Sequence, residues 1–270
     1  MRPGPIARSA AALGATAVAA AGLLTAQAFE ARRRIGRRTT TAPYADGRYG
    51  SGPGTSIRLA ILGDSGAAGL GAEHPEDTIG AILATGLAQV SGRTVTLSNH
   101  AVIGAQTSDL DRQVDRALWT KPHVAVIMIG ANDITHVVPR SLSARRLRRA
   151  IARLRESGTD VVMATCPDLG TVKPVPQPLR SVMRRASRRL AASQAEATLA
   201  AGGRPVSLAS RLGSGFDDDP DVMFSADRFH PSTDGYSALA QALLPEVIAA
   251  WSLGSEGEIL PALAEPADQP

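Results

Sequence analysis

The stretch from Ile57 to Gly71, which reads IRLAILGDSGAAGLG, constrains the fold more than any other part of the chain. Five of the six residues from Ile57 to Leu62 are apolar, and a short run of this kind that ends in glycine is typical of a strand buried on both faces of a parallel sheet. Asp64 and Ser65 follow in a glycine-rich turn, where open α/β sheets bind their ligands. We hypothesise that Ser65 is a nucleophile. A phosphate-cradling glycine loop and a plain strand-to-helix turn are the alternatives.

Apolar runs and helical patterns alternate along the chain after this first strand. Further strands are expected over residues 94–98, 124–129, 160–165 and 205–209, with helices over about 77–91, 108–119, 143–157, 179–201 and 234–251. Such alternation indicates an α/β fold whose central parallel sheet, of about five strands, is covered by helices on both faces.

The two ends of the chain differ in composition from this central part. An Ala-rich run over residues 10–29, with two arginines before it, is typical of a signal-peptide core or a single membrane anchor, and Ala26-Gln27-Ala28 fits a cleavage pattern. We therefore expect a signal peptide or membrane anchor with a basic flank over residues 1–38 and a linker over 39–56. The catalytic domain would span 57–251, and an acidic tail would span 252–270. The protein would be exported to the cell envelope or secreted, or held at the membrane through residues 10–29.

The charge distribution argues against a nucleic-acid partner. Residues 1–38 hold seven arginines and one acidic residue, whereas the rest of the chain holds 22 basic and 24 acidic residues. The expected domain is therefore close to neutral, and a nucleic-acid footprint would need basic charge on the domain itself. The single cysteine, Cys166, excludes an intramolecular disulfide, and the oligomeric state stays open.

Three more polar stretches lie near predicted strand ends or before the last helix. They are NHAVIGA over 99–105, GAND over 130–133 and DRFHP over 227–231. Because the carboxyl ends of parallel strands meet at one edge, we expect the first two to lie close to Ser65.

Together these stretches supply the groups that ester hydrolysis needs. Ser65 can be the nucleophile, His230 the base and Asp227 the group that orients its imidazole. The Ser65 N–H, the Gly104 N–H and the Asn132 amide can stabilise the oxyanion.

The four stretches, in this order, resemble the sequence blocks of the SGNH (GDSL-type) hydrolases over about residues 57–251. The resemblance implies a flavodoxin-like three-layer α/β/α sandwich. It also implies that Ser65, Gly104, Asn132 and His230 are the four name-giving positions and that Asp227 completes the triad. Gly66 stands where this family usually has leucine, which bears on the shape of the acyl pocket.

We therefore expect a serine esterase that forms an acyl-enzyme at Ser65 and requires no metal or organic cofactor. Its substrates would be small-molecule esters, with short acyl chains, or acetylated carbohydrates. An acyltransferase or thioesterase with the same triad is the nearest alternative. A non-catalytic, phosphate-binding module of flavodoxin-like fold is the alternative from another class, but it gives no role to Asp227 and His230 together.

Overall fold

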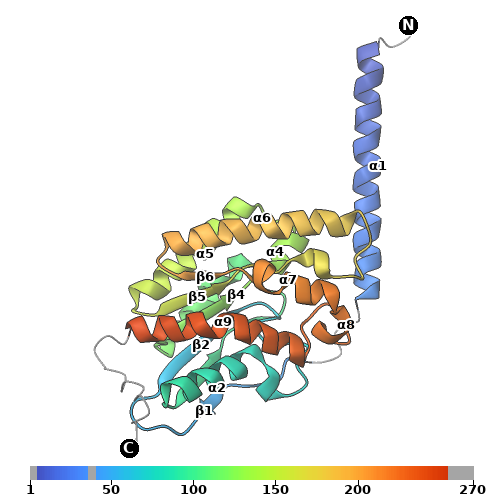
Figure 1. The fold of residues 1–270 in the computed structure, drawn as a ribbon. Helices are drawn as coiled ribbons and strands as arrows, with labels where there is room; N and C mark the ends of the chain where they lie inside the picture. The colour runs from blue at the N-terminus through green and yellow to red at the C-terminus, as the bar shows by residue number, and fades with distance from the viewer. Residues whose placement is uncertain (1–4, 36–40, 255–270) are drawn as a thin grey trace, which may run out of the picture.

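The computed structural model describes residues 5–35 and 41–254 and forms a three-layer α/β/α sandwich around a six-stranded sheet (Figure 1). The strand order is β1-β3-β2-β4-β5-β6. The last five strands of this order are parallel, and in chain order they follow the 2-1-3-4-5 pattern of flavodoxin-like folds. The strands are β1 (Gly47–Tyr49), β2 (Ile57–Gly63), β3 (Val95–Asn99), β4 (Val124–Met128), β5 (Asp160–Ala164) and β6 (Arg204–Val206).

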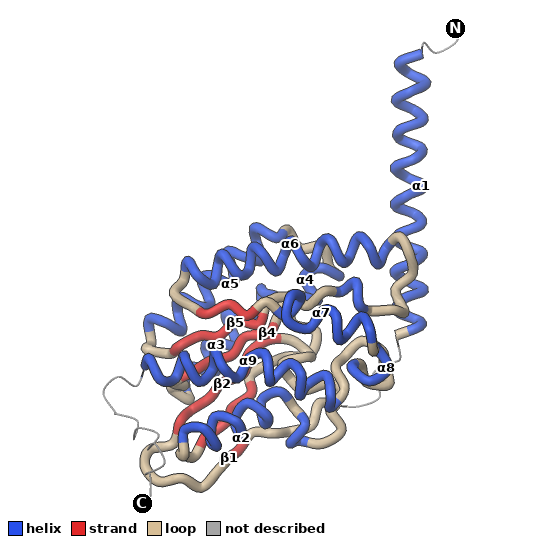
Figure 2. The backbone as a smooth tube through the Cα atoms, viewed as in Figure 1, coloured by secondary structure: helices blue, strands red, loops and turns tan. Residues whose placement is uncertain are grey.

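Helices cover both faces of the sheet, as the apolar strands require (Figure 2). Alternate residues of a strand point to opposite faces. Leu59 and Ile61 of β2 accordingly pack against α2 and α9, whereas Ala60 and Leu62 pack on the side of α3 and α5. Helix α6 lies beside α5. The helices are α1 (Pro5–Arg34), α2 (Ile79–Ser91), α3 (Leu110–Trp119), α4 (Ala131–Thr135), α5 (Arg140–Glu156), α6 (Leu179–Ala200), α7 (Leu208–Asp218), α8 (Pro220–Met223) and α9 (Thr233–Gly254).

The predicted fold class is confirmed, but the sheet differs from the prediction at both edges. Strand β1 lies inside the expected linker 39–56 and pairs antiparallel with β3, and the Asp46 carboxylate accepts a hydrogen bond from Asn99 N at 2.8 Å. The sequence does not predict β1, because a three-residue, largely exposed edge strand has no apolar periodicity. At the other edge, β6 ends at Val206, and the apolar residues of the expected strand 205–209 continue into α7.

Helix α1 projects from the domain, and its last turns contact the domain (Figure 1). Among the described residues, no helix has both the length and the apolar character that crossing a membrane requires. Helix α9 continues to Gly254, and the rest of the expected acidic tail lies outside the described residues, as do residues 36–38 of the basic flank.

Candidate active site

Ser65 lies two residues beyond Gly63, the last residue of β2, at the carboxyl edge of the sheet, and it is buried. Gly63 is required here because a Cβ atom would lie 1.8 Å from the carbonyl oxygen of Met128 on β4, at a φ of 144°. The Gln113 amide, buried on α3, accepts from Gly63 N at 2.7 Å and donates to Gly63 O at 2.8 Å. The last residue pair of β2 and β3 is Ile61 with Asn99, two residues before Gly63. Beyond that pair, Gln113 hydrogen-bonds both backbone groups of Gly63 and so holds the turn that carries Ser65.

His230 and Asp227 reach Ser65 from a tight turn that precedes α9. The Ser65 hydroxyl lies 2.9 Å from His230 Nε2, and His230 Nδ1 lies 2.5 Å from Asp227 Oδ2. Asp227 Oδ1 accepts hydrogen bonds from the backbone N–H groups of Phe229 and His230, both at 2.9 Å, and from the Ser225 hydroxyl at 3.0 Å. The structure therefore brings together the three residues that the sequence analysis assigned to a triad.

Hydrogen bonding sets the charge of Asp227. Burial by itself would raise its pKa, but the hydrogen bonds from the His230 ring and from the backbone of His230 and Phe229 hold the pKa well below its ordinary value. Asp227 is therefore a carboxylate at neutral pH, and its remaining oxygen faces the Nδ1 atom of His230. This arrangement favours the ring tautomer with a proton on Nδ1 and a free Nε2 toward Ser65.

Asp64 is a second buried carboxyl beside the serine. Burial raises its pKa to about 6, although the backbone N–H groups of Gly66 and Gly130 and the charge of His230 favour the ionised form. Its Oδ1 accepts from Gly66 N at 3.1 Å, which shapes the turn around Ser65. Asp64 therefore carries a proton in weakly acidic solution. It also lines an apolar pocket beside Ser65, which is described below.

Asn132 and Gly104 lie at the same edge of the sheet, Asn132 in a short helix and Gly104 in a turn. Asn132 is in the short helix α4, directly after β4, and its Nδ2 donates to Ala105 O at 3.0 Å. This bond ties the Gly104 loop to α4 and leaves the second amide hydrogen of Asn132 free to donate elsewhere. Gly104 has a φ of 85° and is exposed in a turn.

Two supporting positions were missed by the sequence analysis and one was identified only as part of a motif. Gln113 and Gln194 are fully buried, and Gln194 on α6 joins Ile129 O to Cys166 N, beyond the ends of β4 and β5. Asp133, from the GAND stretch, is also fully buried and accepts from Thr107 N and the Ser143 hydroxyl. A glutamine on an amphipathic helix carries no sequence signal that distinguishes this role from a surface position.

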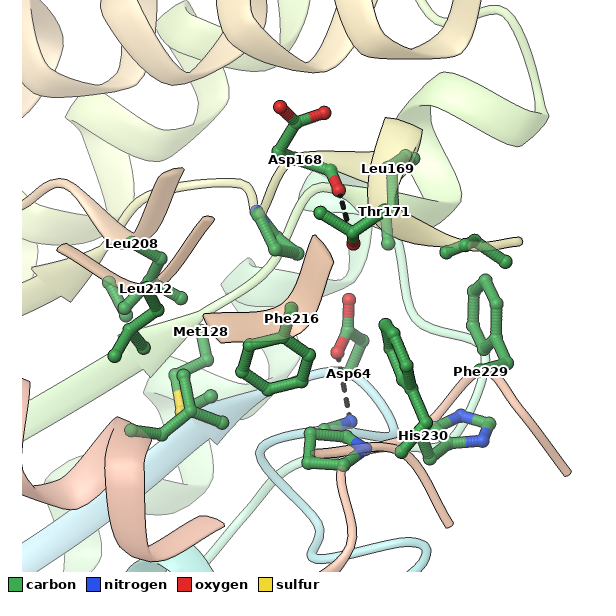
Figure 3. A pocket seen from close by; sticks show the side chains of 18 of the residues that line it. Asp64, Met128, Asp168, Leu169, Thr171, Leu208, Leu212, Phe216, Phe229 and His230 are labelled. Carbon is green, nitrogen blue, oxygen red and sulfur yellow. Dashed lines mark hydrogen bonds between the residues drawn. The ribbon is translucent and has the colours of Figure 1, made fainter. Parts of the chain in front are cut away.

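An apolar pocket of about 110 Å³ opens beside Ser65 and His230 (Figure 3). Figure 3 shows Leu212 and Phe216 of α7 on one side of it and Phe229 with His230 on the other. The remaining apolar side chains of its lining are Met128, Ile129, Ala131, Ala164, Pro167, Leu169, Val172, Leu208, Phe224, Pro231 and Leu239.

An ion-pair network holds α7 over this pocket. Asp217 of α7 pairs with Lys173 at 2.6 Å and with Arg184 of α6 at 2.8 Å. The Lys173 ammonium and the Arg184 guanidinium lower the pKa of Asp217 against the opposing effect of burial. Within the described residues, no group of three or more His, Cys, Asp or Glu side chains is placed to hold a metal ion.

The other histidines lie away from the pocket lining. His136 is exposed, and its Nδ1 lies 2.8 Å from Asn132 O at the outer side of α4. His123 accepts from Arg58 N at 2.9 Å and is structural. Cys166 is buried among Leu190 and Ala191, and burial raises the pKa of its thiol well above the ordinary value, as expected of a packed residue.

A family model, the GDSL-like lipase/acylhydrolase family, matches residues 61–238. The chain is also 41% identical to a GDSL-like esterase of Mycobacterium tuberculosis over an alignment of 242 residues, and this match covers 85% of this chain and 77% of the relative.

Two solved structures have a similar fold. An acetylxylan esterase from Geobacillus stearothermophilus superposes with a TM-score of 0.55 at 20% identity, over 72% of this chain and 95% of that one. An α/β-hydrolase enzyme from the metagenome of Lake Arreo in Spain gives a TM-score of 0.56 at 18% identity, over 73% of this chain and 98% of that one. At these identities the likeness concerns the fold.

Proposed function

Because the chain belongs to the GDSL-like lipase/acylhydrolase family and is a carboxylic ester hydrolase, we propose that it cleaves esters of short carboxylic acids through an acyl-enzyme on Ser65. The observation that carries this proposal is the continuous contact from Ser65 Oγ to His230 Nε2 at 2.9 Å and from His230 Nδ1 to Asp227 at 2.5 Å. This is the relation between nucleophile, base and orienting group that activates a serine hydroxyl.

In the proposed acylation step, Ser65 Oγ bonds to the ester carbonyl carbon while its proton passes to His230 Nε2. The carbonyl π electrons move to the oxygen, and the Ser65 N–H, the Gly104 N–H and the Asn132 amide donate to that oxyanion. When the oxyanion collapses, the bond to the alcohol oxygen breaks and His230 gives its proton to the leaving alcohol. Asp227 stabilises the imidazolium between these transfers without taking its proton.

Deacylation repeats these steps with water. His230 Nε2 accepts a proton from a water molecule whose oxygen attacks the acyl carbon, and the same donors stabilise the second oxyanion. The Ser65–acyl bond then breaks, and His230 returns the proton to Ser65 Oγ. The free enzyme is restored and a carboxylic acid is released.

The size of the pocket supports short acyl chains. An apolar cavity of about 150 Å³ accommodates benzene, so a pocket of about 110 Å³ has room for roughly four carbon atoms. Acetylated carbohydrates also fit within this class, and the acetylxylan esterase of similar fold supports that choice.

Export to the cell envelope, or secretion, stays a prediction from residues 1–38.

We expect nitrophenyl esters to give the highest kcat/KM near four acyl carbons, with a steep fall by ten carbons. Phe216→Ala should raise kcat/KM for the eight-carbon ester about tenfold relative to the four-carbon ester, because each methylene in such a pocket is worth about 1–3 kcal/mol. Leu199→Ala, on the exposed side of α6, is the control. A flat profile, or an optimum at long chains in the parent enzyme, would contradict the short-chain assignment.

Asn132→Ala should lower kcat by about 10²–10³ with little change in KM. Its free amide hydrogen would donate to an oxygen whose charge develops only as Ser65 attacks, and the loss of one such donor has this effect. The melting temperature separates this role from the Ala105 contact, which by itself contributes about 1 kcal/mol to stability. Thr135→Ala, on the same short helix, is the matched control. If Asn132→Ala turns over within a few-fold of the parent, Asn132 is not an oxyanion donor.

A further inference from the structure

The last turns of α1 are docked on the domain, although the helix is exposed further upstream. Gln27 is 8% exposed and Ala31 is 5% exposed, whereas Val18 is 74% and Leu23 is 50% exposed. Figure 1 shows the lower end of α1 against the start of α6 while its upper part extends beyond the sandwich. Among the side chains that the structure describes, those of Gln27, Ala31 and Ile35 therefore define a docked segment, residues 27–35.

Gln27 is the polar anchor of this contact. Its Nε2 donates to Gln177 O, and its Oε1 accepts from Leu179 N at 3.0 Å. Leu179 is the first residue of α6, whose early N–H groups have no partner within the helix. A side chain from α1 thus satisfies both a carbonyl and an N–H of the segment that leads into α6, which fixes that segment relative to α1.

Ala31 and Ile35 provide the apolar part of the contact. They pack into a cluster that we call the support cluster, and whose other members are Val172, Val175, Leu179, Met183, Phe224 and Phe229. The cluster is separate from the two cores that cover the faces of the sheet. Without α1, the buried side chains Val172 and Val175 would lose part of their cover.

Three members of the support cluster also line the pocket beside Ser65: Val172, Phe224 and Phe229. The Phe224 ring packs edge-on against Phe216 of α7 with centroids 4.9 Å apart. The Phe229 ring packs edge-on against His230 with centroids 5.0 Å apart, and its backbone N–H donates to Asp227. One layer of side chains therefore separates α1 from the pocket.

We propose that the segment 27–35, which comprises the end of α1 and the residue after it, is the outer support of the acyl pocket, and that Gln27 and Ala31 are positioning residues that help to set its acyl-chain selectivity. This inference rests on the proposed function, because it concerns the same pocket. Docked, the segment holds Val172, Phe224 and Phe229 inward and keeps the pocket small. Undocked, these side chains have space to move outward, and the pocket accepts longer chains. The cleavage pattern at 26–28 lies within this helix, so cleavage there would remove Gln27.

The test uses the full chain with the double substitution Gln27→Ala/Ala31→Glu, which removes the polar anchor and places a charge in the buried position. The matched control is Thr25→Ala/Ala26→Glu, because both residues are exposed on the same helix. Hydrolysis of two-, four- and eight-carbon nitrophenyl esters is measured beside amide hydrogen exchange over residues 172–183. The rate at which a small fluorophosphonate labels Ser65 reports on the triad.

In the docking variant we expect faster exchange over 172–183 and an about tenfold loss of preference for the four-carbon over the eight-carbon ester, mainly through KM. Labelling of Ser65 and kcat on the acetate should stay within about threefold of the parent, and the control should match the parent throughout. Faster exchange with an unchanged chain-length profile would overturn the proposal. Unchanged exchange would also overturn it, because α1 would then not be docked in solution. If the parent has no Ser65-dependent esterase activity, the proposed function fails instead.

Discussion

Ser65→Ala should lower kcat by about 10⁴–10⁶ while the protein stays folded. No other group in the arrangement can bond to the acyl carbon, and in serine hydrolases the nucleophile and its base act as one unit. The expected change in stability is small, about 1 kcal/mol, because the substitution removes one buried hydrogen bond, from Ser65 to His230. The measurement is kcat on a four-carbon nitrophenyl ester, with the melting temperature beside it.

The matched control for this variant is Ser214→Ala, because Ser214 is exposed on α7, which also contributes to the pocket. It should keep kcat within about twofold of the parent. Residual Ser65→Ala activity within tenfold of the parent, in a folded protein, would mean that water or another residue attacks the ester.

Asp227→Asn should lower kcat by about 10⁴, the effect of imposing the wrong histidine tautomer in a triad. The amide keeps an oxygen that can accept from Phe229 N and His230 N, so the turn should persist. It offers no charge to stabilise the imidazolium, and an amide nitrogen facing Nδ1 favours a proton on Nε2. Asp221→Asn, at an exposed carboxylate of α8, should have no effect on kcat.

The same variant has a signature in the pH dependence of stability. The pKa of Asp227 is lowered on folding, so this group contributes stability above its unfolded pKa of about 4 and loses it as the pH falls. The melting temperature of the parent should therefore fall more steeply than that of Asp227→Asn when the pH is lowered from 5 toward 3. Parallel pH profiles with normal turnover would remove Asp227 from the triad.

The sequence predicts the central part of this fold well, because that part is specified by local patterns. Short apolar runs such as 57–62 and 124–129 favour strands in a sheet covered on both faces, and the structure confirms both strands. Parallel strands place their carboxyl ends together, which is why Ser65 and Asn132 share one edge despite their separation in sequence. The contact of His230 with Ser65 was proposed from chemistry and family resemblance, since no local pattern predicts it.

The features that the sequence does not predict depend on contacts between segments that are far apart in the sequence. Strand β1 is stabilised by its pairing with β3 and has no apolar pattern of its own. Gln113 and Gln194 act through backbone groups about 50 and 30–65 positions away, respectively. Gln27 contacts residues about 150 positions away, so nothing in the Ala-rich run around it indicates that α1 docks beside the pocket.

The assignment of Ser65 as the nucleophile can be tested by labelling the full chain with a fluorophosphonate and mapping the adduct by peptide mass spectrometry. We expect one adduct per chain, on Ser65, at a rate that falls at least about 10³-fold in His230→Gln because the hydroxyl then has no base. Labelling of the parent on another residue, or undiminished labelling of Ser65 in His230→Gln, would contradict this assignment.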